Sequence, residues 1–108
     1  MAVRTIIRLS PPRPRLGALV EVQATIAHPM ETGFRRDDDG VLAPRDIVRR
    51  FRATLDGVEV FSAQLHPGVA ANPYLAFSLR VMGAASLHLE WSGDNGFAHA
   101  EVLALQPA

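Results

Sequence analysis

The sequence predicts an all-β protein, an immunoglobulin-like antiparallel β-sandwich of about seven strands, and three observations support this fold class. Apolar and polar residues alternate with a period of two in several short segments. Turn-forming residues separate these segments about every ten residues. We find no convincing amphipathic helix, which would space its apolar residues by 3.6. Short alternating strands joined by tight turns are typical of two sheets packed face to face.

The strands are identified from this alternation in chain order. It is clearest in residues 18–27, where Val20, Val22 and Ala24 alternate with polar residues, so that one face packs on a core and the other meets water. Residues 10–17 are rich in proline, which supplies no backbone donor, so this segment links the first two strands. The expected strands cover residues 3–9, 18–27, 47–55, 75–80, 87–92 and 97–105, with one more that starts at Val58.

Two turns connect neighbouring strands. Asp56-Gly57 lies between Leu55 and Val58, and a two-residue loop that needs positive backbone φ angles favours Asp-Gly, so we predict a tight hairpin there. Residues 93–96, Gly-Asp-Asn-Gly, turn the chain into the last strand. Trp91, just before this second turn, is expected to be a large piece of the core.

Length and composition exclude several classes of function. The 108 residues suffice for one domain, 1–108, since single domains commonly hold roughly 100 to 150 residues. Eleven basic and eleven acidic residues cancel, which removes the positive field of a general nucleic-acid binder. The absence of cysteine excludes disulfides and thiolate chemistry. No apolar segment has the ~20 residues needed to span a bilayer, and residues 1–12 do not form a signal peptide.

Two segments that do not alternate are the places to look for function, residues 28–44 and residues 65–73, because long loops in small domains tend to be functional. His28, Met30 and Glu31 could suggest a metal site, but the four histidines are far apart in sequence, which argues against it. We expect no metal and no cofactor. No serine has the surroundings of a nucleophile, so we expect no catalytic residues and no enzyme.

A mixed charge run, Arg35-Arg36-Asp37-Asp38-Asp39, lies within the first of these segments. One interpretation is a solvated loop tip. The other is a docking surface for a charged partner or an anionic ligand, because charged loops steer encounters between proteins. The residues alone leave both interpretations open.

The long segment also resembles the SoxZ family, the small subunit of the SoxYZ carrier complex of bacterial thiosulfate oxidation. The resemblance covers nearly the whole chain and is most specific in the long loop. Arg45, which follows the loop motif, departs from the family pattern and leaves partner specificity open. The matching residues are His28, Pro29, Met30, Glu31, Thr32 and Gly33, then 35–37 and 40–44, then Asn72, Pro73 and Tyr74, and finally 90–96.

This resemblance implies a non-catalytic subunit that binds SoxY and helps to present the sulfur intermediates held on the cysteine of SoxY to the sulfur-oxidising enzymes. It implies transient contact with those enzymes. It also implies a periplasmic location, reached together with a signal-bearing SoxY. A chain without a thiol cannot itself carry these intermediates, so it must support the partner that does.

From the resemblance we expect a large interface with SoxY through one sheet, with Arg50 and Arg52 on its polar face. We expect His28 and Met30 to shape the long loop or to dock, and Arg35 and Arg36 to contact anionic sulfur groups or partner enzymes. Without SoxY, the isolated chain would expose the apolar patch of this interface, so we expect that it can form a homodimer. The alternative is an independent immunoglobulin-like module for small-ligand binding or adhesion. A neighbouring gene that encodes a Gly-rich cysteine tail would favour SoxZ.

Overall fold

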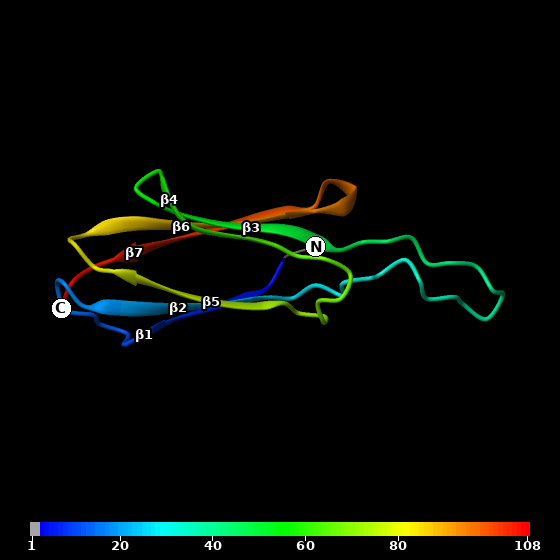
Figure 1. Ribbon diagram of the computed structural model, residues 1–108, viewed down its shortest axis with the longest axis horizontal. Coiled ribbons are helices and arrows are strands. Elements are labelled where there is room, and N and C mark those ends of the chain that lie inside the picture. Colours follow the sequence, from blue (N-terminus) through cyan, green and yellow to red (C-terminus); the bar gives the residue numbers. More distant parts are fainter. Residues whose placement is uncertain (1–2) are drawn as a thin grey trace.

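Seven strands form two antiparallel sheets in the computed structural model, which describes residues 3–108 (Figure 1). Sheet order is β1-β2-β5 in one layer and β4-β3-β6-β7 in the other, which confirms the predicted sandwich. Met1 and Ala2, part of the predicted domain 1–108, lie outside the described residues. The strands are β1 (Thr5–Ser10), β2 (Leu19–Ile26), β3 (Val48–Leu55), β4 (Val58–Gln64), β5 (Tyr74–Arg80), β6 (Ala85–Gly93) and β7 (Ala98–Leu105), with a 3-10 turn η1 (Asp94–Gly96).

The core lies between the two layers and is built from the inward residue of each alternating pair. Trp91 is buried as predicted, and its ring lies 5.1 Å from that of Phe51 on the neighbouring strand β3. Phe61 of β4 and Phe77 of β5 stack with ring centroids 4.8 Å apart, which joins one sheet to the other. Aromatic packing of this kind offsets the missing disulfide of this chain.

The predicted tight hairpin is confirmed. Leu55 pairs with Val58, and the intervening Asp56 and Gly57 have φ angles of 48° and 84°, as a two-residue turn with positive φ requires. Strand ends differ from the predictions by one or two residues, because cross-strand pairing, and not alternation alone, decides where each strand begins. The first strand, for example, starts at Thr5 and not at Val3.

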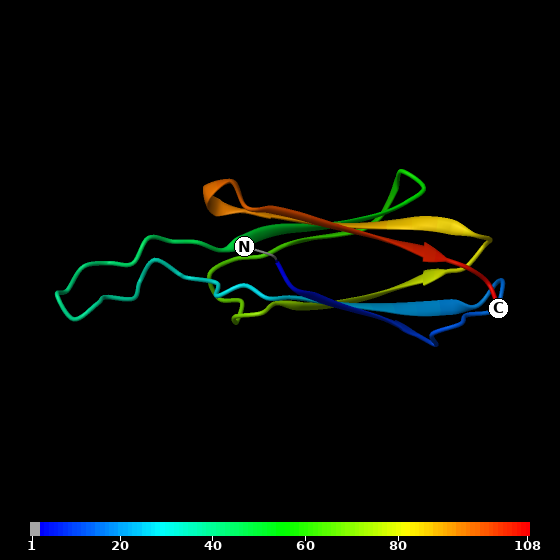
Figure 2. The ribbon, with the colours of Figure 1, turned by 180° about the vertical axis from the view of Figure 1, so that it is seen from behind.

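One segment projects far beyond the sandwich. Residues 31–46, here called the arm, extend from one end of the layers, and the loop 65–73 lies at the same end (Figures 1 and 2). The molecule measures 57 × 23 × 22 Å, and its radius of gyration of 16.2 Å exceeds the ~13 Å expected of a compact chain of this length. Within residues 3–108 there is no helix of the length and hydropathy that a membrane crossing requires.

Candidate functional site

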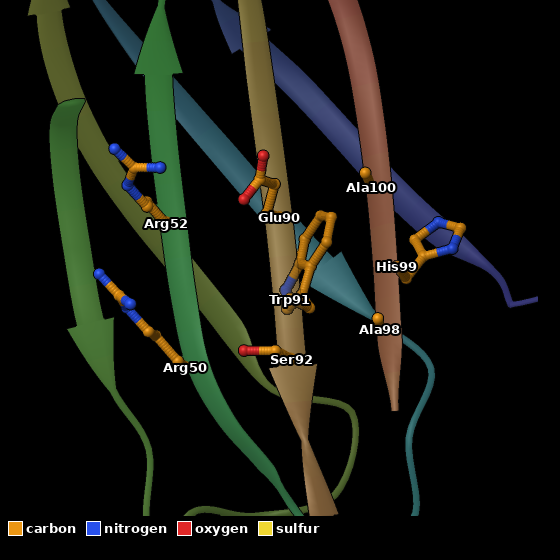
Figure 3. A pocket seen from close by; sticks show the side chains of 8 residues that line it. All are labelled: Arg50, Arg52, Glu90, Trp91, Ser92, Ala98, His99 and Ala100. Atoms are coloured by element: carbon orange, nitrogen blue, oxygen red, sulfur yellow. The ribbon is translucent and has the colours of Figure 1, made fainter. Parts of the chain in front are cut away.

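The outer face of the four-stranded sheet carries the two predicted interface arginines. Arg50 and Arg52 project from β3 beside Glu90 and Ser92 of β6, over a shallow depression of about 380 Å³ (Figure 3). The Arg52 Nε donates to Glu59 Oε1 at 2.7 Å, whereas Arg50 Nη2 lies 3.8 Å from the same oxygen. Small side chains on β7 keep the face shallow. Arg50 therefore has a guanidinium group with no short partner among the described residues.

A β-bulge brings a third arginine to this face. Val48 pairs with Gly93 and Arg50 pairs with Ser92, so Arg49 is the extra residue. The bulge places Arg49 and Arg50 around one depression of about 330 Å³, although consecutive strand residues normally point to opposite faces. Arg49 Nε lies 3.9 Å from Asp94, so its ion pair is also a long one. The result is a positively charged rim close to the base of the arm.

The base of the arm is a pair of backbone hydrogen bonds. Glu31 and Asp46 bond each other through N–H and C=O in both directions, at 2.9 and 2.8 Å. Gly33 permits this close approach, because its φ is 86° and an added Cβ would lie 3.0 Å from the Arg45 Cβ. The arm is therefore a closed two-stranded loop and not a free coil.

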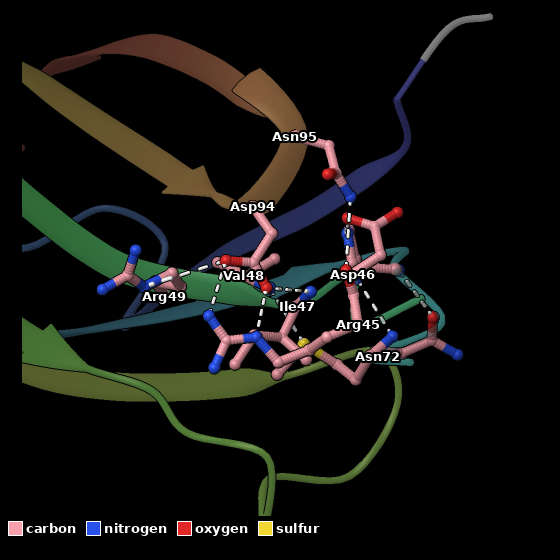
Figure 4. A network of polar contacts seen from close by, with 10 residues as sticks. Arg45, Asp46, Ile47, Val48, Arg49, Asn72, Asp94 and Asn95 are labelled. Atoms are coloured by element: carbon pink, nitrogen blue, oxygen red, sulfur yellow. Dashed lines mark hydrogen bonds and ion pairs between the residues drawn. The ribbon is translucent and has the colours of Figure 1, made fainter. Parts of the chain in front are cut away.

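A buried group of residues supports the arm from inside the sandwich (Figure 4). The His28 N–H donates to Asn72 Oδ1 at 3.0 Å, and the His28 Nδ1 accepts from the Met30 N–H at 3.0 Å. The sulfur of Met30 accepts from the Val48 N–H at 3.3 Å. The His28 ring meets Phe97 edge-on at 4.9 Å. His28 and Met30 are 5% and 4% exposed, so they shape the arm and do not form its surface.

A second support joins the arm to η1. The Arg45 guanidinium donates to both carboxylate oxygens of Asp94, at 2.9 and 3.0 Å, and the Ile47 N–H adds a bond to Asp94 at 3.2 Å. These interactions, with the Arg45 hydrogen bond as the largest cause, hold the pKa of Asp94 below its ordinary value of 3.8. Asn95 donates from its side chain to the Arg45 carbonyl oxygen. Arg45, the departure from the family pattern, thus acts as a clamp within the chain.

The tip of the arm is ordered by its own charges. Arg35 donates to Glu31 at 2.7 and 2.9 Å, and this carboxylate raises the pKa of the Arg35 guanidinium. Arg36 donates to the Gly40 carbonyl oxygen at 2.7 Å. Asp37 accepts from the N–H groups of residues 39 and 41, both at 2.9 Å. Part of the predicted charge run therefore builds the turn, while the side chains of Arg35 and Arg36 remain at the surface.

Three large apolar residues on the arm are exposed, and none of them was a predicted site residue, although Val41 and Leu42 lie within the matching residues 40–44. Phe34, Val41 and Leu42 are 79%, 60% and 47% exposed. Arg36 pairs with Leu42 across the arm, so in a two-stranded register Phe34 and Leu42 belong to the same face. Apolar side chains gathered on an ordered projection mark a protein contact. Their position within a charged, and therefore solvated, segment was the sequence signal that could have indicated their exposure.

The remaining predicted residues lie elsewhere. Thr32 accepts from the Phe34 N–H at 3.2 Å within the arm, and Pro29 is exposed just before it. Pro73 is buried and accepts from the Ile26 N–H. Tyr74 is 58% exposed on the outer face of the three-stranded sheet, opposite to the face of Arg50 and Arg52. The structure therefore brings His28, Met30 and Asn72 together and leaves Tyr74 apart from the arginines.

This arrangement is suited to binding. In the described part of the chain, no three side chains of His, Asp or Glu gather as a metal site would require. What the arm and the arginine face do offer is an ordered apolar surface, arginines held only by long ion pairs, and a fixed base. These are the features of a surface that contacts another protein.

Comparison with known proteins identifies one family. A family model described as "Sulphur oxidation protein SoxZ" matches residues 7–103. A search of curated proteins found no match. Among solved structures, the chain is similar to superoxide reductase (neelaredoxin) from Ignicoccus hospitalis, with 14% identity, a TM-score of 0.73, and 96% of this chain and 80% of that chain covered. A variant of that protein gives 14% identity, a TM-score of 0.71, and coverages of 96% and 79%. Identities this low show a shared fold alone.

Proposed function

Because the chain belongs to the SoxZ family and so has a role in the Sox sulfur-oxidation system, we propose that it is the subunit of the SoxYZ carrier complex that binds SoxY and helps to present sulfur intermediates. In this proposal the chain is a non-catalytic subunit, as the SoxZ family implies, which fits a chain with no cysteine. In this proposal the sulfur atoms stay on the cysteine of SoxY, and the present chain supplies shape and charge around them.

The observation that carries the proposal is the arm with its exposed apolar residues. Phe34 and Leu42 stand on a segment fixed at its base by the Arg45–Asp94 pair and by the Glu31–Asp46 backbone bonds. A rigid apolar projection loses little conformational entropy when it binds, so it is well suited to be the anchor of an interface. In the proposed complex these two side chains lie against SoxY.

The arginine face supports the same proposal. On this face Arg49 and Arg50 have only long ion pairs, of 3.9 and 3.8 Å, among the described residues. Arginine is favoured at interfaces because its planar fork pairs with carboxylates while its stem packs. The four-stranded sheet is therefore the sheet through which SoxY would dock. Arg49 and Arg50 lie at the start of β3, directly after the arm in the chain, so one partner can contact both the arm and the arginine rim.

The sulfur intermediates and the other Sox enzymes complete the proposal. Oxidised sulfur groups are anions, and the exposed Arg35 and Arg36 side chains at the arm would attract them electrostatically. The same charges would steer the brief encounters with the oxidising enzymes, because charged rims act mainly on association rates. The proposed location is the periplasm, reached together with a signal-bearing SoxY.

The test mixes the purified chain with SoxY and measures complex formation by light scattering and calorimetry. A stable complex is expected for the unchanged chain. The double variant Phe34→Ser and Leu42→Ser is expected to bind at least about tenfold more weakly, because each buried apolar anchor contributes on the order of 1–2 kcal/mol. The matched control is Met82→Ser, which removes an apolar side chain that is 75% exposed between β5 and β6, at the end away from the arm. Absence of any complex, or equal weakening by the control, would contradict the proposal.

A further inference from the structure

The outer edge of β7 is open along its whole length. β7 is the last strand in the order β4-β3-β6-β7, and in the described residues no other strand pairs with its far side. Its eight residues pair with β6 from Ser92–Ala98 to Ala85–Leu105 without a break in register. It contains no proline and no bulge, two of the features that protect an edge strand from pairing with another chain, and its one acidic side chain, Glu101, is bonded to His99 of the same strand.

Alternate backbone groups on β7 point away from the sheet. The Gly93 N–H donates to the Phe97 carbonyl oxygen, which makes that pair a hydrogen-bonded one. Hydrogen-bonded and non-bonded pairs alternate along an antiparallel ladder, so residues 99, 101 and 103 bond to β6. The N–H and C=O groups of Ala98, Ala100 and Val102 therefore face the free edge. The side chains at these positions are small or of moderate size and leave room for a second strand.

The other three edges are less suited to pairing with a copy of themselves. Each carries a single charged side chain, Arg8 in β1, Glu59 in β4 and Arg80 in β5, so a second copy could offer only a like charge. β4 is also distorted by an irregularity in its pairing with β3, and β1 runs into Pro11. β7 differs, because it carries two groups that attract one another, His99 and Glu101.

We propose that two copies of this chain pair antiparallel through β7, with Ala100 opposite Ala100 of the second copy. This register places Ala98 opposite Val102 and His99 opposite Glu101 of the second copy, twice by symmetry. Two neighbouring registers also pair the outward-facing backbone groups of the two copies. One of them places His99 opposite His99, and the other places Glu101 opposite Glu101. Two Glu101 carboxylates directly opposite each other are unfavourable, and only the proposed register places each Glu101 opposite a His99 that can hydrogen-bond to it. These two side chains therefore select the proposed register.

The side chains that select this register are already held in place. His99 Nε2 lies 2.9 Å from Glu101 Oε1, and the Thr5 hydroxyl donates to the same oxygen at 2.8 Å. Pairing would join the two four-stranded sheets into one continuous sheet with a twofold axis at Ala100. Because a single strand pair buries little apolar area, the dimer should depend on protein concentration. It does not depend on SoxY or on the arm.

Single cysteines can test the register, because the chain has none of its own. Residues opposite each other in a hydrogen-bonded antiparallel pair have Cα atoms about 5.5 Å apart, within the range of a disulfide. Ala100→Cys is therefore expected to form a disulfide-linked dimer about tenfold faster than Ala98→Cys or Val102→Cys alone. A mixture of the Ala98→Cys and Val102→Cys chains is expected to cross-link rapidly to each other. Equal rates for all three single variants would overturn the proposed register.

A second measurement tests the dimer without cysteine. Ala100→Lys places two like charges at the twofold axis, so sedimentation should show a monomer at concentrations where the unchanged chain is dimeric. The thermal unfolding midpoint of the monomer is expected to stay the same, since this side chain is exposed on the outer face. A chain that is monomeric at all concentrations, or a dimer that Ala100→Lys leaves intact, would overturn the proposal.

Discussion

Arg45 and Asp94 are 49 residues apart in the sequence and form a two-pronged ion pair, with Nε 2.9 Å from Oδ2 and Nη2 3.0 Å from Oδ1. Arg45 belongs to the arm and Asp94 to η1, so this pair ties the projecting segment to the turn between β6 and β7. A planar guanidinium that meets a carboxylate with two bonds fixes direction as well as distance. The pair therefore sets the angle at which the arm leaves the sandwich.

Replacing Arg45 by alanine is expected to loosen the arm while the sandwich stays folded. Without the clamp the backbone bonds between Glu31 and Asp46 open more often, so their amide hydrogens should exchange about tenfold faster. Amides in the core strand β2 should keep their rates. Arg45→Lys keeps the charge and loses the planar, two-bonded guanidinium, so its exchange rate at the arm is expected to lie between those of the unchanged chain and of Arg45→Ala. Unchanged exchange at the arm would show that the clamp is dispensable.

Acid should weaken the same junction. The folded-state pKa of Asp94 lies below its ordinary value of 3.8, so ionised Asp94 stabilises the fold at pH values above 3.8. This contribution is lost as the pH falls below 3.8 through the lowered pKa. Hydrogen exchange at the arm, measured between pH 6 and about pH 3 and corrected for intrinsic rates, should show the loss. In the Asp94→Asn variant the arm should already exchange faster at pH 6, and the further increase in exchange on acidification should be absent. A step of the same size in that variant would assign it to another carboxyl group.

Gly93 has no room for a side chain. A Cβ at this position would overlap the Ile47 carbonyl oxygen, just before β3, and approach the Cα of Val48, the first residue of β3, at 2.9 Å. Gly93→Ala is therefore expected to lower the free energy of unfolding by about 1–3 kcal/mol, measured by denaturant titration. Ser92→Ala, one residue earlier and exposed, should change it by less than about 0.5 kcal/mol. A Gly93→Ala chain as stable as the Ser92→Ala chain would disprove the steric account.

The paired change Arg35→Ala and Arg36→Ala tests the charge at the arm. We expect sulfur turnover by the complex with SoxY to slow by about tenfold at low salt, because rim charges act on encounter rates. Complex formation should be unchanged, since the backbone bonds and the Arg45–Asp94 pair at the base of the arm do not involve these side chains. The matched control removes two exposed arginines at the other end of the molecule, Arg13 and Arg15. Turnover at the normal rate would leave Arg35 and Arg36 as solvated charges that only order the arm.

The fold could be predicted from the sequence because its signals are local. Alternation in residues 18–27 identified β2, and Asp56-Gly57 identified the hairpin, since both depend on neighbours in the chain. The bulge at Arg49 was missed, although a signal existed. Arg49 and Arg50 stand together between Val48 and Phe51, two buried residues, and such a pair breaks the period of two.

The architecture of the arm could not be predicted from local signals. Its supports join residues far apart in the sequence, such as His28 with Asn72 and Arg45 with Asp94. No spacing rule connects such positions without an alignment or a structure. For the same reason His28 and Met30 were predicted either to shape or to dock, and only their burial separates these two roles.

The elongated outline of this chain affects how its mass is measured. A particle 57 Å long and little more than 20 Å across has a larger Stokes radius than a sphere of equal mass, so a monomer should leave a gel-filtration column early and resemble a dimer. Elution volume alone would then confuse one extended molecule with two. Sedimentation equilibrium, whose result is independent of outline, can distinguish them.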